Sequence, residues 1–160
     1  MRIFILITVL SSLLIACGIS KNASSTPEVI SILHGTSFGH CRGYCIKEAV
    51  FTNTSMRYTK YNRDSLNYPK QEIIESFTTE EYTTLLATID WEKWEAMDTI
   101  IGCPDCTDAG AEYIKITTSK GSKRVKFDAY SNPEGLEKLL SECRAKRRKI
   151  DRAEQNKGEE

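Results

Sequence analysis

Two closely spaced cysteine pairs constrain the fold of this 160-residue chain more than any other feature of its sequence. Three residues separate Cys41 from Cys45, and two residues separate Cys103 from Cys106. Each pair can close a local disulfide, and the two pairs together can supply the four thiolates of a zinc site. Disulfides that cross between the pairs would close a longer loop and stabilise more. Spacing alone does not decide among these arrangements.

The N-terminal segment has the layout of a secretory signal. Arg2 supplies one positive charge, residues 3–15 are apolar apart from three hydroxyl side chains, and the small residue Ala16 follows. A membrane-spanning helix needs about 20 apolar residues, and this run is shorter. We therefore expect residues 1–16 to be a signal peptide that is removed and that forms no part of the folded domain.

The end of this segment, Leu14-Ile15-Ala16-Cys17, resembles the lipobox of bacterial lipoproteins. The resemblance implies that Cys17 carries a lipid, which would anchor the mature chain in the cell envelope. Residues 17–27 are small and polar, as is typical of a flexible tether. No Asp follows Cys17, which by enterobacterial sorting rules favours the outer membrane, facing the periplasm.

This compartment changes the interpretation of the cysteines. Thiols outside the cytoplasm are oxidised, and small exported domains use cysteines mainly as disulfides. We therefore favour disulfides among Cys41, Cys45, Cys103 and Cys106, with zinc bound by the same four residues as the alternative. Cys143 falls on an apolar helix face and is expected to be a buried free thiol.

The second pair also raises the question of redox chemistry. Cys103-Pro104-Asp105-Cys106 resembles both a zinc-ribbon knuckle and a glutaredoxin-type active site, whose thiolate lies at the N-terminus of a helix. Here a short loop and then a strand are expected to follow the motif, so a redox enzyme is only the third hypothesis, together with a small hydrolase. The chain has no serine elbow, HExxH or P-loop motif, and we predict no catalytic residues.

Strand composition and helix caps predict one α+β domain over residues 28–150, followed by a disordered polar tail at 151–160. We expect an antiparallel sheet of about five strands with two helices packed on one face. The order is three strands, a helix, two strands and a helix. The expected strands lie at 29–33, 46–52, 56–61, 113–117 and 125–129, with loops at 34–45, 62–71 and 99–110.

The clearest local signal is the start of the first helix. Thr78 and Glu81 form a Thr-x-x-Glu capping box, and Phe77 before the cap can pack on Tyr82 inside the helix. One apolar face then follows, formed by Tyr82, Leu85, Leu86 and Ile89.

The last helix is expected to begin after Asn132, with Pro133 at its first position. A basic run near its end is interpreted as a solvated helix terminus, with contact to anionic lipid or glycan as the alternative. Three acidic residues in the second cysteine loop, Asp105, Asp108 and Glu112, are interpreted as turn residues. The basic run consists of Arg144, Lys146, Arg147, Arg148, Lys149 and Arg152.

Four further side chains are candidates for a binding surface: Trp91, Trp94, His34 and His40. Solvent-facing tryptophans would indicate a binding site, although large aromatic residues after an amphipathic helix more often belong to the core. The two histidines lie in the first cysteine loop, where a base, a metal ligand or a loop hydrogen bond are the alternatives.

The region from residue 29 to about 150 resembles a family of uncharacterised bacterial lipoprotein domains of Bacteroidetes type. That family has a Cys-x-Gly-x-Cys motif after its first strand, matched here by Cys41, Gly43 and Cys45. The resemblance implies that Cys41 and Cys45 can bond to each other, and it implies no activity or catalytic residues. The chain departs from the family at Ile46, where proline is usual, and in its second cysteine pair.

These features predict a cell-envelope lipoprotein whose domain is a non-enzymatic binding or interaction module stapled by disulfides. Its partners would be the membrane, through the lipid on Cys17, and an envelope protein or glycan. The 22 basic and 22 acidic residues do not favour nucleic acid, which usually requires a clearly basic domain. No cofactor is expected unless the zinc alternative holds.

Overall fold

The structure is a computed structural model that describes residues 27–157 of the chain. The predicted signal peptide, the lipidation site at Cys17 and most of the tether lie outside the described residues, as do residues 158–160.

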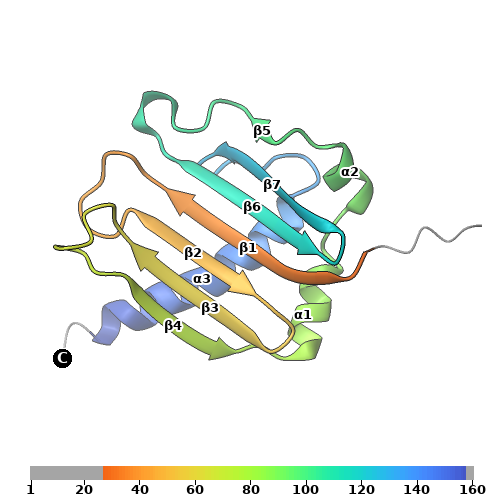
Figure 1. The fold of residues 1–160 in the computed structure, drawn as a ribbon, viewed down its shortest axis with the longest axis horizontal. Helices are drawn as coiled ribbons and strands as arrows, with labels where there is room; N and C mark the ends of the chain where they lie inside the picture. The colour runs from red at the N-terminus through yellow and green to blue at the C-terminus, as the bar shows by residue number, and fades with distance from the viewer. Residues whose placement is uncertain (1–26, 158–160) are drawn as a thin grey trace, which may run out of the picture.

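In the described residues, seven strands form one mixed sheet, accompanied by three α-helices (Figure 1). The strand order is β4-β3-β2-β1-β6-β7-β5, and all neighbours are antiparallel except β5 and β7. The α+β class is confirmed, whereas the predicted count of about five antiparallel strands and two helices is too low. The elements are β1 (Val29–Ser37), β2 (Ile46–Phe51), β3 (Ser55–Tyr61), β4 (Gln71–Ser76), α1 (Thr79–Leu86), α2 (Trp91–Ala96), β5 (Ile100–Ile101), a 3-10 helix (Cys106–Asp108), β6 (Ala111–Thr118), β7 (Gly121–Asp128) and α3 (Glu137–Lys157).

The hydrophobic core lies between the sheet and the helices, chiefly α3, with buried residues of α1 and α2 at its margin. In Figure 1, α3 crosses one face of the sheet, and no helix of residues 27–157 covers the opposite face. Burying one large apolar side chain contributes roughly 1.5–3 kcal/mol to stability. In the described part of the chain, none of the helices is long and apolar enough to cross a membrane. Fully buried core residues include Ile32, Phe51, Tyr58, Ile114 and Phe127 from the sheet, and Leu139, Leu140 and Cys143 from α3.

The central strand β1 is longer than predicted. It pairs with β2 on one side and with β6 on the other, and both ladders continue to Ser37. His34 therefore lies within a strand, and the predicted loop at 34–45 begins only at Phe38. The sequence does not predict this extension, because glycine, here Gly35, is a poor strand former. Glycine is required here, since the ring of Tyr113 occupies the space that a side chain would fill.

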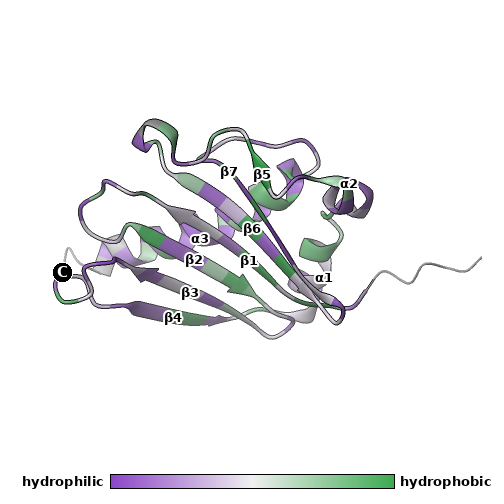
Figure 2. Cartoon of the chain, turned by 45° about the horizontal axis from the view of Figure 1, so that its top comes forward, coloured by the Kyte–Doolittle hydropathy of each residue, from purple (hydrophilic) through white to green (hydrophobic). Residues whose placement is uncertain are grey.

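The sequence does not predict β4 or β5. β4 is an edge strand with five of its six residues exposed, so it lacks the alternation of buried and exposed residues that marks a strand. Figure 2 shows hydrophilic residues on both sides of its short apolar centre. β5 has two residues, and its parallel pairing with Lys126 and Phe127 of β7 is a contact between distant parts of the chain.

The predicted start of the first helix is confirmed. The Thr78 hydroxyl accepts a hydrogen bond from the Glu81 amide at 3.1 Å, and the Thr78 amide donates to the Glu81 carboxylate at 3.0 Å. Tyr82 and Leu85 are buried on the inner face of α1. A further short helix, α2, follows with Asp90 as its N-cap, in addition to the two helices predicted.

Both ends of α3 differ from the prediction. The helix begins at Glu137 rather than after Asn132, because Gly135 adopts a left-handed φ of 88°. It continues to Lys157, so the prediction of a disordered tail is wrong for residues 151–157.

Contacts to the sheet explain why α3 continues. The Tyr58 hydroxyl donates to Asp151 Oδ1 at 2.6 Å, and Lys47 Nζ donates to the same oxygen at 3.0 Å. Lys60 Nζ lies 3.4 Å from Glu154 Oε2. Burial raises the pKa of the Tyr58 phenol, and the bond to Asp151 raises it further, so the hydroxyl remains a donor.

We expect a chain that ends at Ile150 to lose about 1–3 kcal/mol of unfolding free energy, because the buried Tyr58 hydroxyl then lacks its acceptor. Urea denaturation measures this loss. A chain that ends at Lys157 is the control and should match the full chain. Equal stability of both truncated chains would show that the last two turns of α3 contribute nothing.

Candidate functional site

Both cysteine loops lie at the same end of the sheet. Ser37, at the end of β1, pairs with Ile46 at the start of β2 and with Ala111 at the start of β6. The loop after β1 and the loop before β6 are therefore neighbours, although they are far apart in the sequence (Figure 1). We call this the loop end of the sheet. The opposite end, where Val29 begins β1, is the entry end.

The four cysteines pair within their own loops. Disulfides join Cys41 to Cys45, with Cα atoms 5.6 Å apart, and Cys103 to Cys106, with Cα atoms 5.5 Å apart. The predicted disulfides are confirmed, as the two local bridges among the arrangements that spacing leaves open. Cys143 is a free cysteine buried in the core, and burial raises the pKa of its thiol.

The first loop is held against the end of β3. The Phe38 amide donates to the Cys45 carbonyl at 3.1 Å, which closes the loop at its base. The Asn62 side-chain amide, just after β3, donates to the Gly43 carbonyl and lies 3.2 Å from Cys45 Sγ. Asn62 therefore fixes the disulfide relative to the sheet.

The second loop is held against both β7 and the first loop. The Cys103 amide donates to Asp128 Oδ1 at 3.0 Å. Gly110 has a left-handed φ of 79°, and a side chain there would overlap the ring of Phe38. Glycine at this position thus permits the two loops to pack directly on each other.

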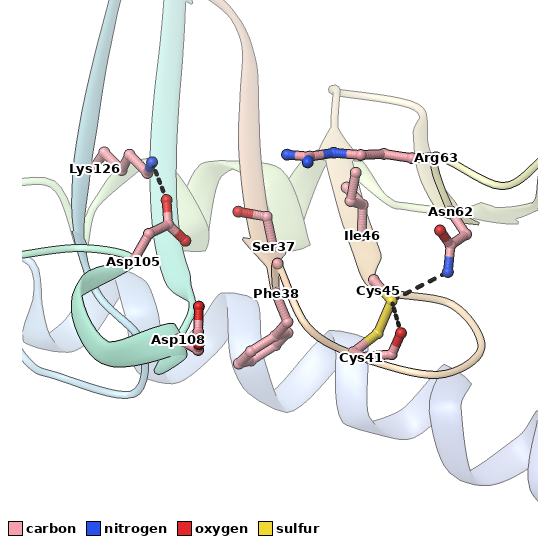
Figure 3. A pocket seen from close by; sticks show the side chains of 11 residues that line it. Ser37, Phe38, Cys41, Cys45, Ile46, Asn62, Arg63, Asp105, Asp108 and Lys126 are labelled. Atoms are coloured by element: carbon pink, nitrogen blue, oxygen red, sulfur yellow. Dashed lines mark hydrogen bonds and ion pairs between the residues drawn. A yellow bond between two sulfur atoms is a disulfide. The ribbon is translucent and has the colours of Figure 1, made fainter.

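A pocket of about 320 Å³ lies between the two loops. Figure 3 shows Asp105, Asp108 and Lys126 on one wall, and Asn62, Arg63 and the Cys41–Cys45 bridge on the other. Ser37 and Phe38, at the end of the central strand, lie between the walls. We call this cavity the disulfide-loop pocket.

The disulfide-loop pocket carries two basic and two acidic side chains. Lys126 Nζ lies 2.5 Å from Asp105 Oδ2, so these two neutralise each other. Asp108 faces His40 at 3.5 Å, and both of these side chains are largely exposed. Arg63 forms no ion pair with any described residue.

Unusual backbone geometry is concentrated around this pocket. Within residues 27–157, three residues other than glycine have a left-handed φ: Asp105 at 68°, Asp108 at 57° and Tyr130 at 63°. The first two line the pocket, and the Tyr130 ring packs on Phe38 with centroids 6.1 Å apart. Such conformations cost energy and gather at functional sites.

A second polar group, which we call the Glu112 cluster, is buried between the sheet and α3. His34 Nε2 lies 2.5 Å from Glu112 Oε1, and both side chains are inaccessible to solvent. Arg144 Nε donates to Glu112 Oε1 at 2.9 Å, and its Nη2 donates to Oε2 at 2.6 Å. The Tyr130 amide donates to Oε2 at 3.1 Å.

The charge states in this cluster follow from burial and hydrogen bonding. Burial alone would raise the pKa of Glu112, but hydrogen bonds from His34 and Arg144 lower it to about 2. Burial lowers the pKa of His34, so its imidazole is neutral at pH 7 and donates to the carboxylate. The histidine and the acid are enclosed, so this pair stabilises the fold rather than meeting a substrate.

The sequence interpretation of these charges is wrong in three places. Arg144 of the basic run is not solvated, since its side chain is 14% exposed and pairs with Glu112. Glu112 is not a turn residue but an inward-facing residue of β6, one step of the alternation before Ile114. Arg147 is not solvated, since it is 8% exposed and its Nη1 donates to Thr36 Oγ1 at 3.2 Å. A sequence signal exists, because Arg147 falls on the same helical stripe as Cys143 and Ile150.

The four residues proposed for a binding surface do not form one. Trp94 and His34 are buried, and His40 is exposed beside the disulfide-loop pocket. Trp91 is half-buried and lines a separate hollow with Val29, at the entry end. The pocket residues Ser37, Asn62, Arg63 and Lys126 were not predicted, because they come from β1, the loop after β3, and β7, and carry no local motif.

Among the described residues, no group of three or more His, Cys, Asp or Glu side chains is arranged to hold a metal ion. The two disulfides use the sulfurs that a zinc site would need as thiolates. No protein-family model matches the chain, and a search of the curated proteins finds no match.

We expect stability to fall as the pH is lowered from 7 to 2. The unfolded chain protonates His34 near pH 6.5 and Glu112 near pH 4.5, whereas the folded chain protonates both only at lower pH. The shift of Glu112 alone corresponds to about 3 kcal/mol, lost mainly below pH 4.5. Denaturant unfolding at several pH values measures the slope.

The control compares two histidine variants. His34→Gln keeps a neutral donor but removes the titration, so the slope between pH 7 and pH 5 should become shallower. His40→Gln changes an exposed residue and should leave the slope unchanged. Identical slopes in both variants would contradict the role given to His34.

Proposed function

We propose that the chain is an envelope lipoprotein whose domain is not an enzyme and binds a partner at the disulfide-loop pocket. One observation carries this proposal. Both disulfides lie at the loop end, around a pocket with exposed charges, while the described chain enters at the opposite end of β1. Rigid loops on a scaffold are the usual carriers of binding function.

The compartment is supported by the state of the cysteines. Disulfides persist in oxidising compartments such as the periplasm and are rare in the cytosol. The four cysteines of the two loops are bridged, and the remaining described cysteine, Cys143, is buried in the core. This pattern fits the lipobox at Leu14-Ile15-Ala16-Cys17 and the resemblance to bacterial lipoprotein domains.

The length of β1 sets the distance between the proposed lipid anchor and the pocket. Its nine residues, at roughly 3.3 Å per residue, separate the entry end from the loop end by about 26 Å. A lipid on Cys17 would attach at the entry end, on the outer membrane in our proposal. The disulfide-loop pocket then lies on the side away from the tether, where an envelope protein or glycan can reach it.

The lipid anchor is tested by metabolic labelling with an alkyne-bearing fatty acid in a Gram-negative host. We expect the wild-type chain to be labelled and Cys17→Ser to be unlabelled, since the thiol is the acceptor. Cys143→Ser is the control and should be labelled like the wild type, because Cys143 is buried. An unlabelled wild-type chain would refute the anchor.

Native mass spectrometry of residues 18–160, purified from the periplasm, tests the cysteine framework. We expect a mass deficit of two hydrogens for each of the two disulfides, restored by reductant and unaffected by a chelator. The double variant Cys103→Ser, Cys106→Ser should retain one disulfide. A zinc-sized excess lost to the chelator, with all thiols reduced, would favour the zinc alternative and overturn the disulfide framework.

A further inference from the structure

The charges of the disulfide-loop pocket are arranged on two opposing walls (Figure 3). On one wall, Lys126 neutralises Asp105, and Asp108 carries the remaining negative charge, with the exposed His40 ring 3.5 Å from its Oδ1. On the other wall, the positive charge of Arg63 has no carboxylate partner among the described residues. The pocket therefore presents one positive and one negative group that face each other across Ser37.

We propose that this pocket binds a small zwitterion, such as a short peptide with both ends free. Its carboxylate would pair with Arg63, and its ammonium group would pair with Asp108 and with the Asp105 oxygen that Lys126 leaves free. The inference rests on the proposed function, because it names the ligand class of the same site.

The balance of charge selects this ligand class. A simple anion attracted by Arg63 would meet the charge of Asp108 on the facing wall, where Lys126 is already paired with Asp105, and like charges repel in a confined site. A simple cation attracted by Asp108 would meet Arg63 in the same way. Only a ligand that carries both charges satisfies both walls at once.

The side chains suit the two ends of such a ligand. The guanidinium of Arg63 is a planar fork that can bind a carboxylate through two parallel hydrogen bonds. Figure 3 shows this group extended over Ile46 toward Ser37. An ammonium group donates three hydrogen bonds, and the carboxylates of Asp105 and Asp108 and the hydroxyl of Ser37 can accept them.

Size and rigidity favour a small ligand. The volume of about 320 Å³ is at the lower end of the range of about 300–1,000 Å³ for small-molecule sites. The Cys41–Cys45 bridge forms part of one wall, and the loop closed by Cys103–Cys106 forms the other. Walls fixed in this way lose little conformational freedom on binding, which favours affinity.

The test uses the oxidised chain of residues 18–160, which contains every described residue. L-alanyl-L-alanine is titrated into it, and binding is followed through the amide chemical shifts of Ser37, Phe38 and Arg63. The N-acetylated dipeptide and the dipeptide amide each lack one charge. We expect each blocked form to bind about ten- to hundredfold more weakly, because hydrogen bonds to charged groups carry that much affinity.

Single substitutions test whether Arg63 binds the carboxylate of the ligand and Asp108 binds its ammonium group. Arg63→Gln and Asp108→Asn should each weaken binding of the free dipeptide about tenfold or more. Arg57→Gln is the control, since Arg57 is an exposed arginine on β3 that pairs with Glu72, and its binding should equal the wild type. Because all three side chains are exposed, the variants should fold normally.

Two results would overturn the inference. One is the absence of shifts at the pocket amides, and the other is equal binding of the free and blocked dipeptides. The blocked dipeptides test the wild-type chain, so this outcome does not depend on the folding of any variant. Failure here would leave the lipid anchor and the disulfides standing, because these are measured separately.

Discussion

The pairing of β1 with strands on both sides is the constraint on which the rest of the molecule depends. Its last residue, Ser37, pairs with the first residue of β2 on one side and with the first residue of β6 on the other. This one register brings together two cysteine loops that are distant in the sequence. Each disulfide closes only its own loop, so the contact between the loops comes from the sheet and from the packing of Phe38 against Gly110.

The Glu112 cluster links this sheet to α3 and, indirectly, to the pocket. A buried carboxylate is costly unless its oxygens are bonded, and here His34, Arg144 and the Tyr130 amide satisfy them. The bond to the Tyr130 amide helps to hold that residue in its left-handed conformation, with its ring on Phe38. The cluster thus stabilises the turn whose Tyr130 ring packs on Phe38, between the two walls of the disulfide-loop pocket.

Local sequence patterns predicted the elements whose stability is local. The Thr78–Glu81 capping box, the β2–β3 and β6–β7 hairpins and the burial of Cys143 all follow from spacing and composition. The edge strand β4 was not predicted, because five of its six residues are exposed and the sequence therefore shows no alternation of apolar and polar residues. The last turns of α3 were hidden because Asp151 bonds to Tyr58, a contact between residues far apart in the chain.

The candidate site was less predictable than the fold for the same physical reason. The cysteines identify the two loops in the sequence. The charged residues of the pocket come from segments that lie far apart in the chain, and they form a site only because the fold brings these segments together. Arg63 illustrates this, since an exposed arginine after a strand has no distinguishing pattern, and only the facing wall with Asp105 and Asp108 gives it a complement. The two disulfides keep each loop in one conformation, and this fixes the positions of the charged side chains that the loops carry. The sheet register and the packing of Phe38 against Gly110 hold the two walls in place, and each disulfide restricts the motion of its own loop. Arg63 and Asp108 therefore remain apart and available to a ligand instead of pairing with each other.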